Sequence, residues 1–385
     1  MNHFEFQTVP HIISQTGAAN HVGQTIALHY PATRHVLLVT DAGFLKTGLM
    51  QAAIDNIRAQ QIEVSVFSDV VADPPEAIVL AAASQAHILG IDLVVGFGGG
   101  SSMDVAKLIA ILAGNEQELS SMYGIGNIKG QRLPLIQIPT TAGTGSEATP
   151  IAVVTTGETS KMGVVAPQLY ADIAILDAQL TLGLPVAVSA ATGIDAMVHA
   201  IEAFTTKHKK NPLSDMLAKQ ALQLLWSNIR TVCREPQNLA ARQAMLLGAF
   251  LAGQSFANAP CAAVHALAYP IGGIFHVPHG LSNSLVLPAV LRFNASAAHP
   301  HYAELAAIVA PHEQGSSEAK SSALINALEQ LTCELGIATR LQQVGIKEGD
   351  LDKITTDAML QTRLLGNNPR EVTWQQARAI YAEVL

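Results

Sequence analysis

The order of strand-like and helix-like segments along the chain limits the possible folds most strongly. Through about residue 180, short runs rich in β-branched and aliphatic residues alternate with helix-like stretches. The expected strands are His35–Asp41, Glu63–Phe67, Asp92–Phe97, Pro134–Pro139 and Ala174–Asp177, and the expected helices are Gly48–Gln60, Pro75–Leu89 and Ser102–Leu112. This alternation predicts an α/β fold with a mostly parallel sheet and helices on both faces.

The pattern changes near Leu184-Pro185, after which strand signals fade. The Ala- and Leu-rich stretches that follow predict helices at Ser189–Phe204, Ser214–Val232, Leu239–Asn258 and Ser321–Leu335. A chain of 385 residues is also too long for one ordinary core. We therefore expect two domains, an α/β domain over residues 1–185 and an all-helical domain over residues 186–385.

Composition excludes several classes of function. Hydrophobic residues make up 49% and charged residues 14%, which is typical of a compact, core-rich globular protein. The formal net charge of −8 argues against a nucleic-acid partner. The N-terminus has no basic segment followed by an apolar one, and the apolar stretches are interrupted before they reach a membrane-spanning length, so we expect no signal peptide and no membrane span. Three sparse cysteines fit reduced thiols in a cytoplasm.

A glycine-rich turn joins the third expected strand to a helix. In Gly98-Gly99-Gly100-Ser101, the missing Cβ atoms let backbone amides approach a phosphate, and the following helix directs its positive end to the same place. A tight turn without a ligand is the alternative. Lys107 lies farther along this helix and is expected to face away from the phosphate.

A second turn, Pro139–Glu147, follows another buried strand. It carries the hydroxyls of Thr140, Thr141, Thr144 and Ser146 at the carboxyl end of a strand, where open α/β sheets bind ligands. Asp41 ends the first strand, where a carboxylate either binds a ribose hydroxyl and repels the 2′-phosphate of NADP or caps the next helix. The first alternative predicts NAD as the cofactor.

Four later residues have the chemistry of metal ligands. Asp195 and His199 are four residues apart on an expected helix and project from one face. His265 lies in an apolar helix, where a core or capping role is the alternative, and His279 is expected on a constrained turn between Pro278 and Gly280. One carboxylate and three imidazoles suit Fe²⁺ or Zn²⁺. Glu202 is expected to support this set rather than bind the metal.

Together these motifs resemble the iron-containing (group III) alcohol dehydrogenases, whose superfamily also holds glycerol dehydrogenase and dehydroquinate synthase. Gly98–Ser101 with Asp104 and Lys107 resembles the family's pyrophosphate loop, Pro139–Glu147 its nicotinamide-side loop, and Lys161 its lysine near the nicotinamide ribose. Asp195, His199, His265 and His279 match the four metal positions. The resemblance implies a Rossmann-like nucleotide-binding domain, a helical metal-binding domain of the dehydroquinate synthase-like fold, an active site in the cleft between them, and a homodimer.

The chain departs from the family pattern at two positions. Tyr269 occupies the place of a further His four residues after the third ligand, and Asp73 replaces a common Asn before Pro. The proton released in catalysis must therefore leave through water, a ribose hydroxyl, Tyr269 or His276.

The resemblance implies an enzyme that interconverts a small alcohol and its aldehyde or ketone by hydride transfer to or from NAD, with the metal as Lewis acid. One alternative is a hydroxyacid–oxoacid transhydrogenase, which would turn over without free NAD. A second is a dehydroquinate-synthase-like lyase, which would need a phosphate pocket rich in Lys and Arg. The stretch from Gly253 to Leu291, which has no Lys, argues against it. The last is a protein that binds NAD and metal without alcohol turnover.

Overall fold

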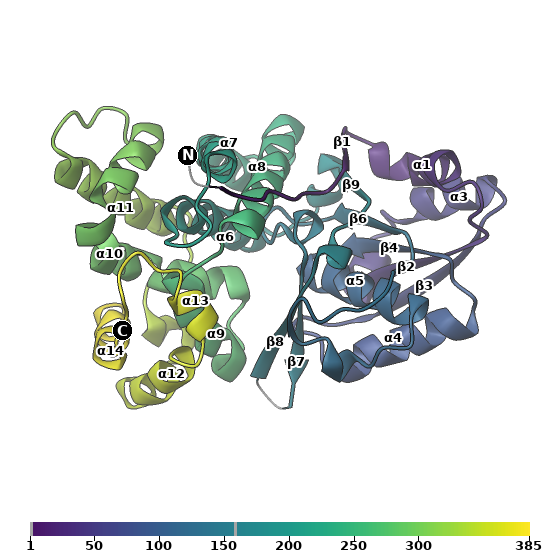
Figure 1. Ribbon diagram of the computed structural model, residues 1–385. Coiled ribbons are helices and arrows are strands. Elements are labelled where there is room, and N and C mark those ends of the chain that lie inside the picture. The colour runs from purple at the N-terminus through teal and green to yellow at the C-terminus, as the bar shows by residue number, and fades with distance from the viewer. Residues whose placement is uncertain (1–2, 158–159) are drawn as a thin grey trace. The chain divides into compact units, whose positions relative to one another are not determined.

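The computed structural model describes residues 3–157 and 160–385 and divides the chain into two compact units (Figure 1). The first unit is Gln7–Gly183, and the second is Leu184–Leu385 together with the described residues before Gln7.

A six-stranded parallel sheet forms the centre of the first unit. Its strands are β1 (His11–Ser14), β2 (His35–Asp41), β3 (Glu63–Val70), β4 (Leu93–Gly98), β6 (Leu135–Pro139) and β9 (Ile173–Leu176). They lie in the order β1-β9-β6-β4-β2-β3. Every residue of β4 and β6 is buried, which explains their continuous apolar sequences. The predicted parallel sheet is confirmed, whereas the short edge strand β1 was not predicted.

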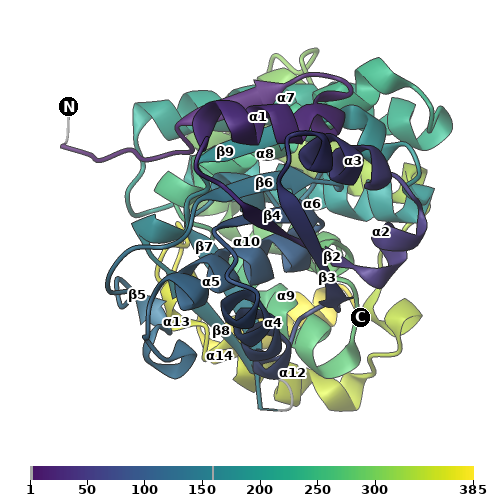
Figure 2. The same ribbon diagram turned by 90° about the vertical axis from the view of Figure 1, so that its right-hand side faces the viewer.

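Helices cover both faces of this sheet (Figure 2). They are α1 (Val22–His29), α2 (Ala42–Lys46), α3 (Gln51–Ala59), α4 (Glu76–Ile88) and α5 (Gly100–Gly114). Val36 and Leu38 of β2 pack against Ile26 of α1 and Ile57 of α3 in one buried core. Helix α5 contacts β4, β2 and β6, and α4 packs against α5. The helix expected from Ser102 begins two residues earlier, at Gly100, with Gly99 as its N-cap residue and Gly98 as the last residue of β4.

A small second sheet in this unit was not predicted. It contains β5 (Gly124–Ile125), β7 (Ile151–Thr156) and β8 (Ser160–Val165), with β7 and β8 antiparallel. Short 3₁₀ segments connect the main elements at Ala18–His21, Leu119–Ser121, Ser146–Ala148, Pro167–Leu169 and Ala178–Thr181.

The described part of the second unit contains helices and no strand. The helices are α6 (Val186–Thr205), α7 (Pro212–Arg234), α8 (Leu239–Asn258), α9 (Ala263–Phe275), α10 (His279–Val309), α11 (Ser317–Glu334), α12 (Leu351–Ala358), α13 (Thr362–Leu365) and α14 (Trp374–Glu383), with 3₁₀ segments at Leu341–Val344 and Glu348–Asp350. Helices α7, α8 and α10 pack around α6. The predicted helical domain is confirmed.

Helix α6 bears on the expectation that the chain has no membrane span. It is long and apolar enough to pass a membrane-span test by length and composition, with a mean hydropathy of 1.2. However, 72% of the qualifying window is buried inside the protein. A core helix passes the same test, so α6 is weak evidence for a membrane span.

Candidate active site

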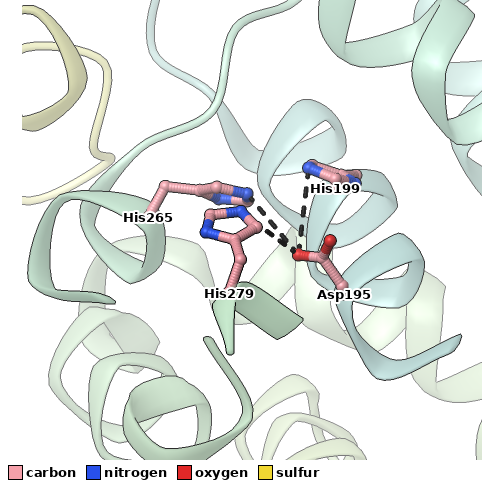
Figure 3. A group of neighbouring side chains, drawn as sticks. All are labelled: Asp195, His199, His265 and His279. Carbon is pink, nitrogen blue, oxygen red and sulfur yellow. Dashed lines mark ion pairs between the residues drawn. The ribbon is translucent and has the colours of Figure 1, made fainter. Parts of the chain in front are cut away.

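Asp195, His199, His265 and His279 converge in the second unit (Figure 3). Asp195 Oδ1 lies 4.0 Å from His199 Nε2, 3.9 Å from His265 Nε2 and 3.7 Å from His279 Nε2. One ligand atom from each residue can be chosen so that all four lie within 4.8 Å of one another. The structure thus brings together all four residues that the sequence singled out as metal ligands.

Three helices supply these side chains. Asp195 and His199 lie one turn apart on α6, and His265 belongs to the first turn of α9. His279 is the first residue of α10, with Pro278 at the N-cap, so it begins a helix rather than lying in the expected turn. A Cβ at Gly280 would lie 2.5 Å from the carbonyl oxygen of Ala191. Glycine at this position therefore allows the start of α10 to approach α6 next to Asp195.

Glu202 orients His265. Glu202 lies on α6, about one turn after His199. Its buried carboxylate lies at the N-terminus of α9, where it accepts hydrogen bonds from the backbone N–H groups of Ala262 and Val264 at 3.0 and 2.7 Å. Its Oε2 also lies 2.6 Å from His265 Nδ1. Because Ala262 cannot cap α9 with a side chain, Glu202 performs this function from a distant part of the sequence. The contact with Nδ1 leaves Nε2 of His265 directed toward the other three residues, which is the arrangement of a supported metal ligand.

The donor atoms fit a divalent metal ion. The buried Nε2 of His265 has no hydrogen-bond partner, which is costly unless a ligand completes it. Burial raises the pKa of Asp195, but His199, His279, His265 and the hydrogen bond from Asn283 outweigh it, so the pKa lies below its usual value. A carboxylate with three imidazoles suits Fe²⁺ or Zn²⁺.

Two supporting residues were missed by the sequence analysis. Asn283 donates to Asp195 Oδ1 at 2.6 Å, and the ring of Phe256 stacks on His199 with centroids 4.3 Å apart. Asn283 follows His279 by one helical turn, a spacing that was visible in the sequence. Phe256 lies on α8, and no local spacing connects it to His199.

The two candidate proton carriers differ in their surroundings. Tyr269 lies one turn after His265, with its ring 6.0 Å from the ring of His279 by centroids. Burial raises the pKa of its phenol above the usual value. His276 ends α9 in a left-handed conformation (φ 56°), is exposed, and does not belong to the four-residue cluster. Tyr269 is therefore close to the candidate metal ligands, whereas His276 has a clear structural role as a helix C-cap.

The two loops of the first unit lie side by side. Gly98 of β4 pairs with Pro139 of β6, and the N–H of Thr140 donates to the carbonyl of Gly98 at 2.9 Å. A Cβ at Gly100 would lie 2.8 Å from the side chain of Thr144. Glycine at this position thus permits the contact between the loops.

This edge of the sheet has unfilled hydrogen-bonding capacity. Helix α5 has no side-chain cap at its N-terminus, and the buried hydroxyl of Thr141 has no hydrogen-bond partner. Ser101 lies in the first turn of the same helix. The free backbone N–H groups at the N-terminus of an α-helix form a site for a phosphate group. The glycine turn and the neighbouring threonines therefore fit the pyrophosphate part of a dinucleotide.

Asp41 lies at the same edge, because β2 is the neighbour of β4 in the sheet. Its Oδ1 accepts a hydrogen bond from the N–H of Phe44 at 2.8 Å, so Asp41 caps α2. The capping alternative is therefore observed. The second carboxylate oxygen remains available for the ribose role, because the cap uses only Oδ1.

Asp104 and Ser146 use their polar atoms within the protein. The hydroxyl of Ser146 donates to Asp104 Oδ1 at 2.6 Å, and Asp104 Oδ2 accepts from the N–H of Val153 at 2.9 Å. Lys107 is fully buried and points away from the glycine turn toward Ser146, as expected. These three residues connect the loops to each other.

Lys161 lies on β8, in the small second sheet of the first unit. Its ammonium group forms an ion pair with Asp73, the residue at which the chain departs from the family's common Asn. Asp73 has a left-handed backbone (φ 53°), and its carbonyl accepts from the hydroxyl of Thr155 on β7. The carboxylate of Asp73 thus provides Lys161 with a charged partner.

Comparison with known proteins places this combination of fold and metal-ligand geometry in a dehydrogenase family. Residues 10–178 match the family described as iron-containing alcohol dehydrogenase, and residues 189–385 match the C-terminal part of the Fe-containing alcohol dehydrogenase family. The chain belongs to the iron-containing alcohol dehydrogenase family and has its dehydroquinate synthase-like fold. The resemblance expected from the motifs is confirmed.

Individual relatives differ in substrate. The chain is 39% identical to long-chain-alcohol dehydrogenase 1 of Geobacillus thermodenitrificans, over 90% of this chain and 89% of that protein. The crystal structure of a 1,3-propanediol oxidoreductase superposes with a TM-score of 0.96 at 33% identity, covering 100% of both chains. A sulfoacetaldehyde reductase from Bifidobacterium kashiwanohense, solved in complex with NAD⁺, gives a TM-score of 0.88 at 28% identity, covering 100% of this chain and 99% of that one.

Proposed function

We propose that this protein is a metal-dependent, NAD-linked alcohol dehydrogenase that interconverts a small alcohol and its aldehyde or ketone. The observation that carries this proposal is the convergence of one carboxylate and three imidazoles with a buried, unpartnered His265 Nε2. Membership of the iron-containing family favours Fe²⁺, and Zn²⁺ is the alternative for the same donor set.

The metal-binding unit supplies the residues that hold and orient the ion. Asp195, His199, His265 and His279 would bind it, Glu202 fixes the imidazole of His265, and Asn283 fixes the carboxylate of Asp195. When bound, the metal supplies Lewis-acid stabilisation of negative charge on the substrate oxygen. The supporting hydrogen bonds hold the ligand atoms in place before the ion arrives, so less order is lost on binding.

The first unit supplies the residues for the dinucleotide. Gly98, Gly99, Gly100 and Ser101 would receive the pyrophosphate, with Thr140, Thr141 and Thr144 beside it. Asp41 would accept a hydrogen bond from the adenosine ribose and disfavour NADP by charge. The bound nicotinamide supplies the hydride acceptor, and the protein positions it. NAD binding by a structurally similar relative supports this assignment.

The proposal extends to the substrate class, the assembly and the location. The relatives' names include alcohols and aldehydes of different size and charge, so we propose a small alcohol or aldehyde without naming one. We also propose a homodimer in the cytoplasm, without a nucleic-acid or membrane partner, from the family resemblance and the composition.

A screen of NADH formation across alcohols tests the proposal. The protein should be assayed in parallel as metal-free protein and after loading with Fe²⁺ or Zn²⁺. We expect NADH to form with at least one alcohol in a loaded sample and not in the metal-free sample. Turnover between an alcohol and an aldehyde without free NAD would instead indicate the transhydrogenase. NADH binding without turnover by any alcohol would indicate a binding protein.

A further inference from the structure

The buried side chain of Lys107 connects three separate parts of the first unit. Its fully buried ammonium group donates to Ser146 Oγ at 2.8 Å, to Thr149 Oγ1 at 3.3 Å and to the carbonyl of Ile151 at 2.6 Å. An ammonium group has three hydrogens, so these acceptors use all of them. Lys107 therefore has no donor left for a ligand.

Asp104, one helical turn before Lys107, completes the network. Its Oδ1 accepts from the hydroxyl of Ser146 at 2.6 Å and lies 3.5 Å from Lys107 Nζ, and its Oδ2 accepts from the N–H of Val153 at 2.9 Å. The carboxylate of Asp104 compensates the charge of the ammonium group of Lys107, which is shielded from water. Helix α5 is thereby fixed to the end of the second loop and to β7.

This network determines how the two loops meet. Helix α5 begins at Gly100, where a Cβ would collide with Thr144 of the second loop. Lys107 and Asp104 hold the same helix and the same loop together two turns further along. Two sets of contacts therefore fix the spacing between the N-terminus of α5 and Thr141–Thr144. One is the close packing of Gly100 against Thr144, and the other is the hydrogen bonding of Lys107 and Asp104 to Ser146.

We propose that Lys107, with Asp104, is a positioning residue for the dinucleotide: it aligns the loop Pro139–Glu147 with the glycine turn and does not touch the cofactor. This inference rests on the proposed function, because it assumes that the two loops bind NAD. Groups that bind one ligand from two loops lose affinity when the loops move by a fraction of an ångström. The alternative is that Lys107 only stabilises the fold.

A matched control distinguishes these two roles. Arg132 is a second cation of the first unit and is mostly buried: it donates to both carboxylate oxygens of Asp172 at 2.7 Å and to the carbonyls of Gln168 and Tyr170. It precedes β6 and therefore lies at the opposite edge of the sheet from the two loops. Arg132→Met removes several hydrogen bonds of a mostly buried cation at the edge of the sheet away from the loops.

The experiment measures the Kd of NADH by fluorescence for the metal-loaded protein and for Lys107→Met and Arg132→Met. We expect Lys107→Met to raise the Kd by about tenfold or more and Arg132→Met to leave it unchanged at a similar loss of Tm. Hydrogen exchange of backbone amides should accelerate between residues 139 and 149 in Lys107→Met and not in Arg132→Met. Equal Kd values in all three proteins, or equal losses in both variants, would overturn the positioning role.

A milder variant keeps the test informative if Lys107→Met does not fold. Thr149→Val preserves shape and removes one acceptor of Lys107, and it should raise the Kd of NADH in the same direction. An unchanged Kd in a folded Thr149→Val would count against the proposal. Absence of NADH binding by the unsubstituted protein would contradict the proposed function itself, whereas normal binding by the variants would contradict only the role of Lys107.

Discussion

At the scale of single residues, most of the proposed chemistry depends on where one oxygen or nitrogen atom is directed. Glu202 occupies Nδ1 of His265, which leaves Nε2 for the ion, and Asn283 holds Asp195 Oδ1. The cap at α2 uses only Oδ1 of Asp41. Substitutions that change one such atom and keep the others are therefore the most informative.

Asp41→Ser tests cofactor choice. Serine keeps an oxygen that can cap α2 and removes the negative charge that would repel the 2′-phosphate of NADP. We expect the ratio of kcat/KM for NADP to that for NAD to rise by about tenfold. Asp41→Asn, which also caps well, should behave similarly. A wild-type protein that already prefers NADP would show that Asp41 does not select the cofactor.

His265→Ala and His279→Ala test the ligand assignment. Each should reduce the metal content from about one ion per chain to near zero and abolish turnover, because the remaining donors are too few to retain the ion. NADH binding should survive, since the loops belong to the other unit. Elemental analysis and NADH fluorescence provide the two measurements, and full metal occupancy in either variant would remove that residue from the site.

Tyr269→His tests the route of the proton. Burial raises the pKa of the Tyr269 phenol, so this group stays protonated and is a poor proton acceptor near neutral pH. An imidazole titrates near pH 6.5, so the variant should begin to oxidise alcohol at lower pH, with metal still bound. The rate against pH for one good substrate should be compared in both proteins. Coincident profiles with altered alcohol preference would mean that Tyr269 only shapes the substrate site.

At the scale of elements, the site depends on contacts between helix ends that are distant in sequence. Helix α9 has Ala262 as its N-cap residue and therefore no side-chain cap of its own. Glu202 of α6 caps this helix and also orients His265. A single residue thus couples the start of one helix to the position of a metal ligand.

Glu202→Gln tests this coupling. The amide has one acceptor oxygen instead of two, so it cannot serve both backbone N–H groups and His265 equally well. We expect metal affinity to fall by about tenfold to a hundredfold, as measured by competition with a chelator, while the far-ultraviolet circular dichroism stays unchanged. Asn228→Ala on the neighbouring helix α7, which removes a bond only to its own helix, is a suitable control. Unchanged metal affinity in Glu202→Gln would show that Glu202 caps α9 without contributing to metal binding.

The sequence predicted those features that leave a local pattern along the chain. The central strands are buried on both faces and read as continuous apolar runs, and Asp195 and His199 share one helical face. The hairpin of β7 and β8 was missed; β7 buries only Ala152 and Val154 and so lacks the continuous burial of the central strands. The stacking of Phe256 on His199, the partners of Lys107 and the pairing of Lys161 with Asp73 arise from tertiary contacts, and spacing along the chain does not encode these.

At the scale of the whole molecule, the chain combines two units with different physical tasks. The parallel sheet ends its buried strands at two loops that leave backbone amides and hydroxyls available. The helical unit surrounds α6 and gathers one carboxylate and three imidazoles from three helices. Alcohol oxidation would require both units, because one binds the hydride acceptor and the other the Lewis acid.

The most direct test of this account is a titration of metal-free protein with Fe²⁺, in which bound metal and alcohol-dependent NADH formation are measured in the same samples. We predict that the rate rises in proportion to bound iron and saturates near one ion per chain, and that His265→Ala gains neither iron nor activity. Alcohol-dependent NADH formation at full rate by metal-free protein, or iron bound stoichiometrically by His265→Ala, would contradict the account.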